Sequence, residues 1–324
     1  MIRIALDAMG GDLGPRAAVQ GAILALRNAP GPMAVVLAGD GPVLQGLISE
    51  LGGEHLPLSV VHASQVVEMG EAPTVALKTK PDSSLVVAVG LQKKGLVEAS
   101  VSPGNTGAMM AASLMVLGRA GKISRPTVAV VLPSGESGIV MVDSGANVDE
   151  KPFQLLQFAV CGASYAKHVI GVASPKVALL NMGEEEHKGT ETVAETHQLL
   201  KASPLNFVGN VEGHDIPRGG FDVLVTPGFT GNVVLKMYEG MGEFMARNFR
   251  KGLQGEPYDS IFEKMNYENR AGGLLLGLDG TSVIMHGRSS AKAFVSGLHI
   301  AYRMASAGVH RKIAEEIEHL ELPA

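Results

Sequence analysis

Short apolar runs rich in β-branched residues alternate with longer amphipathic stretches, and this alternation constrains the fold more than any other feature of the chain. Several runs are apolar throughout, as strands covered on both faces are. The predicted strands are 2–6, 34–38, 58–62, 85–89, 99–102, 128–132, 139–142, 177–180, 207–211 and 223–225. The predicted helices include 14–29, 154–165 and 192–202. The pattern indicates a doubly wound α/β fold with a mostly parallel sheet.

The composition supports one large globular body. Of the 324 residues, 46% are apolar and 18% are charged, which supplies a sizeable core and excludes a disordered chain. No internal repeat, low-complexity tract or linker interrupts the pattern. We therefore expect residues 1–324 to form a single compact α/β catalytic unit.

Charge and cysteine usage narrow the partners and the compartment. The net charge is −5, which disfavours nucleic acid because phosphate neutralisation needs clustered positive charge. The single cysteine, Cys161, cannot form an internal disulfide, and it lies in an apolar helical pattern that predicts core packing. The first residues resemble a strand rather than an export signal, so a cytoplasmic location is expected.

Glycine-rich loops follow many of the predicted strands. In open α/β sheets the carboxyl ends of the strands are where ligands bind. Glycine before a helix start brings backbone N–H groups close to an anion, and residues 104–107 and 228–231 fit this use best. The loops are 7–12, 102–108, 143–147, 181–191, 212–215 and 226–232. Together they predict a polar anion site.

The chemistry of the site follows from what the loops contain and lack. The sequence has no dinucleotide fingerprint, phosphate-binding P-loop, nucleophile elbow or zinc-binding His-Glu-x-x-His, so we expect no cofactor, no metal and no covalent intermediate. The cation Lys188 follows the acidic run 184–186 inside a glycine loop, where it is predicted to hold a defined position.

Six motifs, in order along the chain, resemble those of one family. They are Asp-Ala-Met-Gly-Gly-Asp at 7–12, Gly-Asn-Thr-Gly-Ala at 104–108, Asp-x-Gly-Ala-Asn at 143–147, Gly-Glu-Glu-Glu-His-Lys-Gly-Thr-Glu at 183–191, Val-Glu-Gly-His-Asp at 211–215 and Gly-Phe-Thr-Gly-Asn at 228–232. The resemblance is to bacterial acyl-ACP:phosphate acyltransferases, which start phospholipid synthesis, and it covers residues 1 to about 310. It implies a Rossmann-like three-layer α/β/α fold akin to phosphotransacetylases and isocitrate-type dehydrogenases.

The resemblance implies that inorganic phosphate attacks the thioester of a long-chain acyl-ACP and gives an acyl-phosphate. Phosphate is already a nucleophile, so the enzyme has to position it and stabilise an oxyanion. The catalytic candidates are Lys188, Asn105, Glu185 and His187. The candidates for binding phosphate or substrate are Asp7, Gly10, Gly11, Asp12, Gly104, Thr106, Gly107, Asp143, Asn147, Asn181, Gly183, Asp215, Gly228, Thr230, Gly231 and Asn232.

Two places depart from the family pattern. Pro227 stands where an Asp is usual, which puts an acid–base or hydrogen-bonding role at that position in doubt. Residues 272–277 lack the usual Ala-Pro, and Arg288 follows the His-Gly pair where a small polar residue is commoner. These changes are expected to alter the details of the loops and to leave the overall resemblance intact.

Two other classes of function stay open. One is a related α/β enzyme, either a phosphate acetyltransferase acting on short acyl-CoA or an isocitrate-type dehydrogenase. The dehydrogenase would need a metal-binding carboxylate cluster, for which Asp143, Asp149 and Asp215 are the candidates. The other is a non-catalytic, membrane-associated scaffold of lipid synthesis.

Residues 240–269 do not fit the strand–helix alternation, and they predict a protruding helical hairpin. Its apolar face favours a contact that joins two subunits into a homodimer. Its tip is predicted to contact acyl-ACP, the inner face of the membrane, or both, through Arg247, Phe249, Arg250, Lys251 and Leu253. Such a tip would pass acyl-phosphate to the membrane glycerol-3-phosphate acyltransferase that the resemblance implies as a partner.

Overall fold

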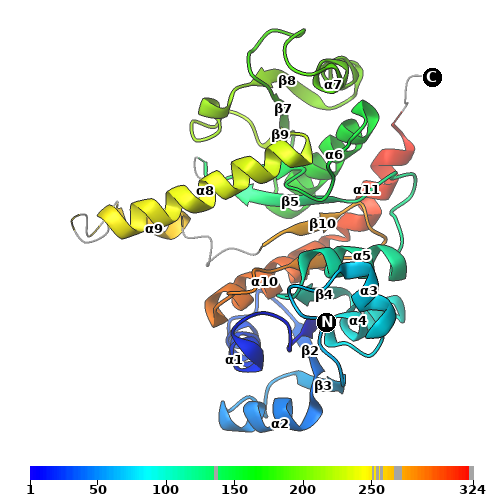
Figure 1. Ribbon diagram of the computed structural model, residues 1–324, viewed down its shortest axis with the longest axis vertical. Helices are drawn as coiled ribbons and strands as arrows, with labels where there is room; N and C mark the ends of the chain where they lie inside the picture. The colour runs from blue at the N-terminus through cyan, green and yellow to red at the C-terminus, as the bar shows by residue number, and fades with distance from the viewer. Residues whose placement is uncertain (135–137, 250–251, 253–254, 256–257, 266–271, 321–324) are drawn as a thin grey trace. The chain divides into compact units, whose positions relative to one another are not determined.

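The structure is a computed structural model that describes residues 1–134, 138–249, 252, 255, 258–265 and 272–320 (Figure 1). The chain forms two compact units. The first comprises Met1–Gly118 and Glu268–Gly308, and the second comprises Arg119–Tyr267 and Val309–Ala324. Because the chain passes from one unit to the other more than once, no linker-like stretch marks the boundary in the sequence. The prediction of one catalytic body for residues 1–324 stays a prediction.

Among the described residues, the first unit has six strands in the order β3-β2-β1-β4-β11-β10. All neighbours are parallel except β10 and β11. The strands are β1 (Ile2–Asp7), β2 (Met33–Gly39), β3 (Leu58–His62), β4 (Ala99–Ser102), β10 (Leu274–Leu276) and β11 (Ser282–Ile284). The helices are α1 (Gly14–Arg27), α2 (Gly41–Glu50), α3 (Pro73–Thr79), α4 (Ser84–Lys93), α5 (Thr106–Val116) and α10 (Ala291–Ala307).

Helices cover both faces of these strands. Helices α1 and α10 pack against each other, and α4 packs against α5 (Figure 1). The close approach of α1 to α10 depends on Gly21, where a Cβ atom would overlap Phe294. Burial on both faces explains why the central strands are apolar at successive positions.

The second unit has, in the part of the chain that the structure describes, five strands in the order β5-β6-β9-β7-β8, parallel except for β5 with β6. The strands are β5 (Thr127–Leu132), β6 (Ile139–Val142), β7 (Lys176–Leu180), β8 (Asn206–Val211) and β9 (Val223–Val225). The helices are α6 (Pro152–Tyr165), η1 (Ala166–Ile170, a π-helix), α7 (Glu191–Ala202), η2 (Gly213–Asp215, a 3₁₀-helix), α8 (Gly228–Phe249), α9 (Tyr258–Met265) and α11 (Val309–Glu318).

The two faces of β6 carry different helices. Ile139 and Met141 belong to a buried cluster against which α8 packs through Val234 and Leu235. Val142 points the other way and lies close to Gly162 of α6. Because side chains alternate along a strand, α6 and α8 lie on opposite faces. The predicted mostly parallel α/β fold with helices on both faces is confirmed.

One predicted strand is wrong. Residues 85–89 lie in α4, where Leu85, Ala88 and Val89 are buried at a spacing of three and one along the helix. Ala88 packs with Ala5 and Ala38 of the neighbouring strands. In a short apolar run, the periodicity of the sequence does not distinguish a buried strand from a buried helix. Here the packing against the neighbouring strands favours the helix.

The described part of the predicted hairpin region contains the end of α8 and all of α9, and α8 is longer than expected. Helix α8 begins at Gly228, before the predicted stretch, and α9 packs against it where Gly242 lies next to Met265. Residues 250–251, 253–254, 256–257 and 266–271 lie outside the described residues. Among the helices that the structure describes, none is long and apolar enough to cross a membrane.

Candidate functional site

In the first unit, the loops after β1 and β4 are tied together by the buried carboxylate of Asp7. It accepts hydrogen bonds from the backbone N–H groups of Met9 (3.2 Å) and Gly10 (3.0 Å) and from the Ser102 hydroxyl (2.6 Å). The Ser102 Oγ in turn accepts a bond from Gly104 N–H (3.1 Å). Asp7 therefore organises the loops, and its oxygens are used within the protein.

The loop that follows β11 is hydrogen-bonded to the loop that follows β1. The N–H of Asp12 donates to the carbonyl of Gly287 (2.7 Å). Gly11 has a φ of +85°, and a Cβ atom on it would lie 2.9 Å from the same carbonyl oxygen. Glycine is therefore required at position 11 both for its backbone conformation and for close packing.

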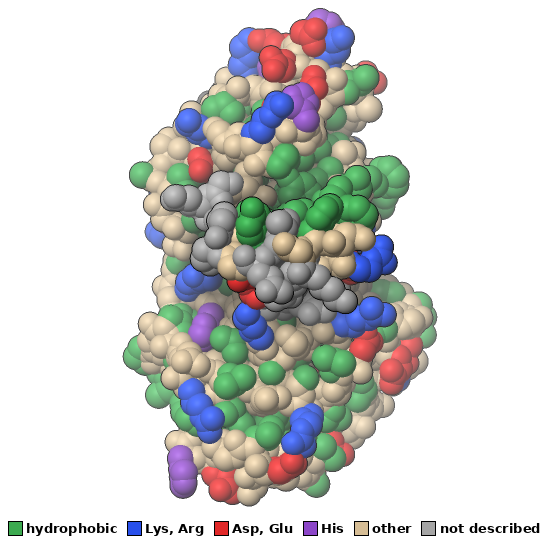
Figure 2. All heavy atoms as spheres, turned by 90° about the vertical axis from the view of Figure 1, so that its left-hand side faces the viewer, with side chains coloured by type: hydrophobic (Ala, Val, Ile, Leu, Met, Phe, Trp, Pro, Cys, Tyr) green, Lys and Arg blue, Asp and Glu red, His purple; other side chains and the backbone are tan. Residues whose placement is uncertain are grey.

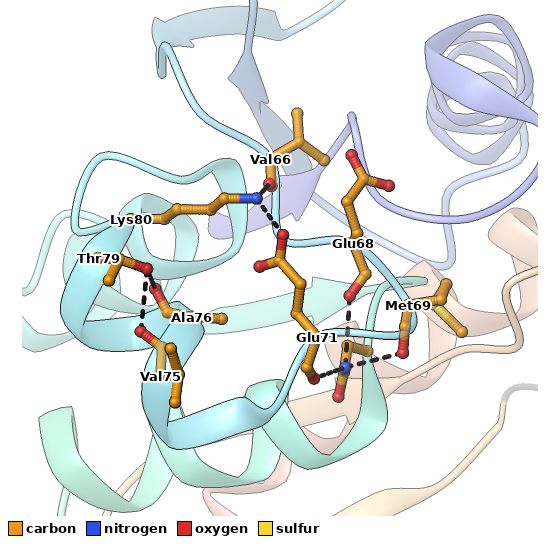
Figure 3. Close-up of polar contacts among 9 residues, drawn as sticks. Val66, Glu68, Met69, Glu71, Val75, Ala76, Thr79 and Lys80 are labelled. Carbon is orange, nitrogen blue, oxygen red and sulfur yellow. Dashed lines mark hydrogen bonds and ion pairs between the residues drawn. The ribbon is translucent and has the colours of Figure 1, made fainter.

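Asn105 connects the start of α5 to the loop that precedes α3. Its side-chain oxygen caps α5 by accepting the N–H of Ala108 (3.0 Å). Its amide nitrogen donates to the carbonyl oxygens of Glu68 (3.4 Å), Met69 (3.0 Å) and Glu71 (2.9 Å). Figure 3 labels these three acceptor residues. The predicted catalytic amide is thus engaged by the protein at both ends, and it positions a loop.

A half-buried ion pair holds the other side of that loop. Lys80 pairs with the Glu71 carboxylate and donates to the Val66 carbonyl at 2.7 Å (Figure 3). The first turn of α5 remains accessible beside the loop, since Thr106 is exposed and Gly107 is half-buried. The first N–H groups of a helix have no acceptor within it, so this turn presents donors.

In the second unit, Asp143 is the centre of the loop after β6. It is fully buried. Its carboxylate accepts five hydrogen bonds of 2.8 to 3.2 Å, from the backbone N–H groups of Val128, Gly145, Ala146 and Asn147 and from the Asn147 side chain. The Asn147 amide also donates to the Pro126 carbonyl at 3.1 Å. The side chains of Asp143 and Asn147, which were both predicted to bind phosphate or substrate, are therefore used in hydrogen bonds that fix the loop.

The start of α8 packs directly on this loop. The N–H of Gly228 donates to the buried carboxylate of Glu150 at 2.6 Å. A Cβ atom on Gly228 would lie 2.8 Å from oxygens of both Glu150 and Asp143, and one on Gly231 would overlap the Asp143 carbonyl. A protein carboxylate already complements the positive end of the α8 dipole. Thr230 and Asn232 are exposed on the same turn.

The loop from 181 to 191 carries Lys188 in a defined backbone position. The Asn181 amide donates to the Lys188 carbonyl (2.9 Å), and the Lys188 N–H donates to the Glu185 carbonyl (3.1 Å). The Lys188 ammonium lies 3.9 Å from the Glu185 carboxylate, and its side chain is 43% exposed. A Cβ atom on Gly183 would lie within 3.3 Å of both side chains, so this glycine lets them pack over it.

The other acidic and basic residues of this loop point to different partners. Glu186 pairs with Lys201 at 2.7 Å, and the hydrogen bond from that lysine lowers the pKa of Glu186. Glu184 and His187 are exposed. The structure therefore brings Lys188 and Glu185 together, whereas within the described residues no hydrogen bond or ion pair holds His187 as a catalytic base would be held.

Asp215 belongs to a separate polar cluster at η2. Its carboxylate accepts the N–H of Glu212 at 3.0 Å and a bond from Arg218 at 3.1 Å. The backbone hydrogen bond from Glu212 is the main reason that the pKa of Asp215 is lowered. Within the described parts of the chain, no three His, Cys, Asp or Glu side chains gather where they could hold a metal ion.

Cys161 and the hairpin residues complete the predicted set. Burial raises the pKa of the Cys161 thiol, which fits a core side chain. Arg247 and Phe249 are exposed at the end of α8. Arg250, Lys251 and Leu253 lie outside the described residues.

Several residues that shape these loops were not predicted. They are Ser102, Glu150, His197 and Asn210. Ser102 is the first residue of the predicted glycine loop 102–108, and its position at the end of the strand is a usable signal. The other three are single polar residues with no spacing pattern, because their partners are distant in the sequence.

The chain is similar to known proteins over nearly its whole length. A family model described as "Fatty acid synthesis protein" matches residues 2–312. A phosphate acyltransferase of Desulforamulus reducens is 42% identical, over 98% of this chain and 98% of the relative.

Solved structures with the same fold include enzymes of two kinds. A phosphotransacetylase from Streptococcus pyogenes has a TM-score of 0.61 at 17% identity, over 98% of this chain and 94% of that one. A 4-hydroxythreonine-4-phosphate dehydrogenase from Burkholderia phymatum has a TM-score of 0.52 at 14% identity, over 98% of each chain. At these identities the likeness shows the fold alone, and it confirms the predicted phosphotransacetylase-like and dehydrogenase-like architecture.

Proposed function

The chain belongs to the phosphate acyltransferase family and is an acyltransferase of fatty-acid synthesis, and on this premise we propose its substrates. We propose that it transfers a long-chain acyl group from acyl-ACP to inorganic phosphate and forms acyl-phosphate for phospholipid synthesis. The observation that carries the proposal is the position of Lys188, whose backbone is fixed on both sides while its ammonium group remains accessible.

The chemistry needs few protein groups. An oxygen of hydrogen phosphate bonds to the thioester carbonyl carbon, the C–S bond then breaks, and the ACP thiolate leaves and takes up the proton that hydrogen phosphate carried. Lys188 is proposed to stabilise the negative charge on phosphate or on the carbonyl oxygen. One such donor contributes roughly 3 kcal/mol to transition-state stabilisation in comparable acyl transfers.

The proposed phosphate site is the first turn of α5, at Thr106 and Gly107. Both loops predicted to bind the anion lead into a helix, and a helix start favours negative charge. At α8, however, the Glu150 carboxylate already accepts the Gly228 N–H, and the Asp143 carboxylate lies close to the same glycine. A second anion there would face two carboxylates, which favours the α5 turn.

The direct test is to incubate the protein with palmitoyl-ACP, with and without phosphate, and to measure the ACP thiol released. We expect release that depends on phosphate, and an anion at the α5 turn in crystals soaked with phosphate. Activity on acetyl-CoA but not on palmitoyl-ACP would instead support a phosphate acetyltransferase. Binding of lipid with no turnover of either thioester would support a scaffold, and an anion found only at α8 would contradict the phosphate site.

We further propose that α8 and α9 form a homodimer contact and a membrane or ACP contact. An apolar stripe runs along α8 at helical spacing, and its side chains are between 42% and 66% exposed. The stripe consists of Phe229, Val233, Met237, Met241 and Phe244. Figure 2 shows hydrophobic side chains gathered on the face that carries α8 and α9. A second copy of the stripe, self-complementary about a two-fold axis, would cover this surface.

Charge reversal at the hairpin tests its tip. The triple variant Arg247→Glu, Arg250→Glu and Lys251→Glu is expected to lose pelleting with anionic liposomes, to raise the KM for acyl-ACP, or both, because anionic partners are repelled. The control reverses three cations elsewhere, Lys122→Glu, Lys176→Glu and Lys312→Glu, with the same change in net charge. If the two triple variants behave alike, the tip has no special role.

For the stripe, Met237→Glu is expected to lower the sedimenting mass to one 33.7 kDa chain, and an unchanged mass would remove α8 from the dimer contact.

A further inference from the structure

We propose that Asn210 and His197 are positioning residues that fix the backbone of Lys188 for the reaction. This inference rests on the proposed function, because it assigns their purpose through the role of Lys188. Neither residue belongs to the glycine loop itself. Asn210 lies in β8, and His197 lies in the middle of α7.

Two asparagines hold the Lys188 turn from opposite sides. Asn181 donates to the carbonyl oxygen of Lys188 at 2.9 Å. The Asn210 amide donates at 2.9 Å to the Glu185 carbonyl, which is the same oxygen that accepts the Lys188 N–H. Both peptide groups that flank the Lys188 side chain are therefore fixed, one directly and one through Glu185.

The hydrogen bond between His197 and Asn210 sets the orientation of the asparagine. Because the Asn210 nitrogen is used on the Glu185 carbonyl, its oxygen faces the His197 ring, 2.8 Å from Nδ1. An amide oxygen is only an acceptor, so Nδ1 has to carry a hydrogen. His197 is buried, and its ring meets the Phe207 ring edge-on at a centroid distance of 5.0 Å, which restricts rotation of the imidazole.

The arrangement does not require His197 to be charged. The donor is Nδ1–H, which is present in one neutral tautomer and in the imidazolium ion. The other ring nitrogen lies 3.9 Å from the Glu186 carboxylate, which is itself paired with Lys201. Among the described residues, Glu186 is the carboxylate within 4 Å of a ring nitrogen, and it faces Nε2 and not the Nδ1 that bonds Asn210. Protonation of His197 therefore leaves the bond to Asn210 in place.

Substitutions at His197 separate the hydrogen bond from the packing. His197→Asn keeps a donor near the position of Nδ1, whereas His197→Gln places its amide near the position of Nε2. Both variants lose the ring and its contact with Phe207 to a similar extent. We expect His197→Asn to retain at least five times the kcat of His197→Gln, with the KM for acyl-ACP within twofold of each other. Equal kcat values for the two variants would overturn the proposal.

Asn210→Asp tests the second bond with an isosteric change. A carboxylate cannot donate to the Glu185 carbonyl, so we expect kcat to fall at least tenfold and amide hydrogen exchange at residues 185–188 to quicken. Asn206→Asp makes the same change at the exposed start of β8 and is expected to do neither. Wild-type kcat in Asn210→Asp would overturn the proposal, and the His197 pair decides the matter if that variant does not fold.

Hydrogen exchange also separates this inference from the proposed function. If the wild-type protein lacks the proposed activity, faster exchange in Asn210→Asp still shows that the asparagine holds the turn. The proposed catalytic role of the Asn210 hydrogen bond would then fail together with the proposed function. If Lys188→Ala loses turnover while Asn210→Asp keeps it, the proposed function stands and the positioning role fails.

Discussion

Replacing Lys188 by alanine is expected to lower turnover of palmitoyl-ACP at least tenfold and to leave the melting temperature nearly unchanged. The ammonium group supplies the positive charge proposed for the transition state, and a tenfold loss corresponds to about 1.4 kcal/mol. Its ion pair with Glu185 is long, at 3.9 Å, and exposed, so its loss costs little stability. Steady-state release of the ACP thiol and thermal unfolding by circular dichroism provide the two measurements.

Lys201→Ala is the matched control for this substitution. Lys201 is also an exposed lysine paired with a glutamate of the same loop, at 2.7 Å from Glu186. Its amine pairs with Glu186 and not with Glu185, and its side chain is 57% exposed, so turnover in Lys201→Ala is expected to remain near the wild-type value. Equal losses in the two variants would mean that the charge of the loop matters and that Lys188 has no particular role.

The fold was predictable where periodicity and burial agree. The strands at the centre of each unit and the helices α1, α6 and α7 lie within a few residues of their predicted positions, because long patterns average over local exceptions. The run 85–89 shows the limit, since five apolar residues fit a buried helix as well as a buried strand. The beginning of α8 shows a second limit of the sequence pattern. Gly228 and Gly231 are residue types typical of a loop, although they lie in the first turn of a helix.

The sequence also indicated which polar residues gather at the strand ends, but it could not show what they bind. Asp7 ends β1 and Asp143 directly follows β6, so each lies at the carboxyl end of a strand in its own unit. Their hydrogen-bond partners are backbone groups of the loops, whose positions depend on the folded chain. An aspartate that organises a loop and one that contacts a substrate have the same sequence signature. Asn210 and His197 went unnoticed for a related reason, since each has its partner in another element.

Gly231 shows how a glycine in a predicted anion loop serves packing instead. Its Cα atom lies so close to the loop after β6 that a Cβ atom would overlap the Asp143 carbonyl oxygen and lie 2.9 Å from the Thr226 methyl group. The obstacle is backbone, which cannot rotate away. Because Asp143 holds that backbone through its five hydrogen bonds, the loop cannot yield without losing them.

Gly231→Ala is therefore expected to destabilise the protein by about 3 kcal/mol, the upper part of the usual range for overpacking. For a protein of this size the melting temperature is expected to fall by roughly 4 to 5 °C in differential scanning calorimetry. Gly240→Ala makes the same change on the same helix at an exposed position with no atom within 4 Å of the new methyl group. Alanine is the better helix former, so that variant is expected to gain about 0.5–1 kcal/mol. If both substitutions raised the melting temperature, the start of α8 would not be packed on the Asp143 loop, and Gly231 would regain its place as a candidate for approach to an anion.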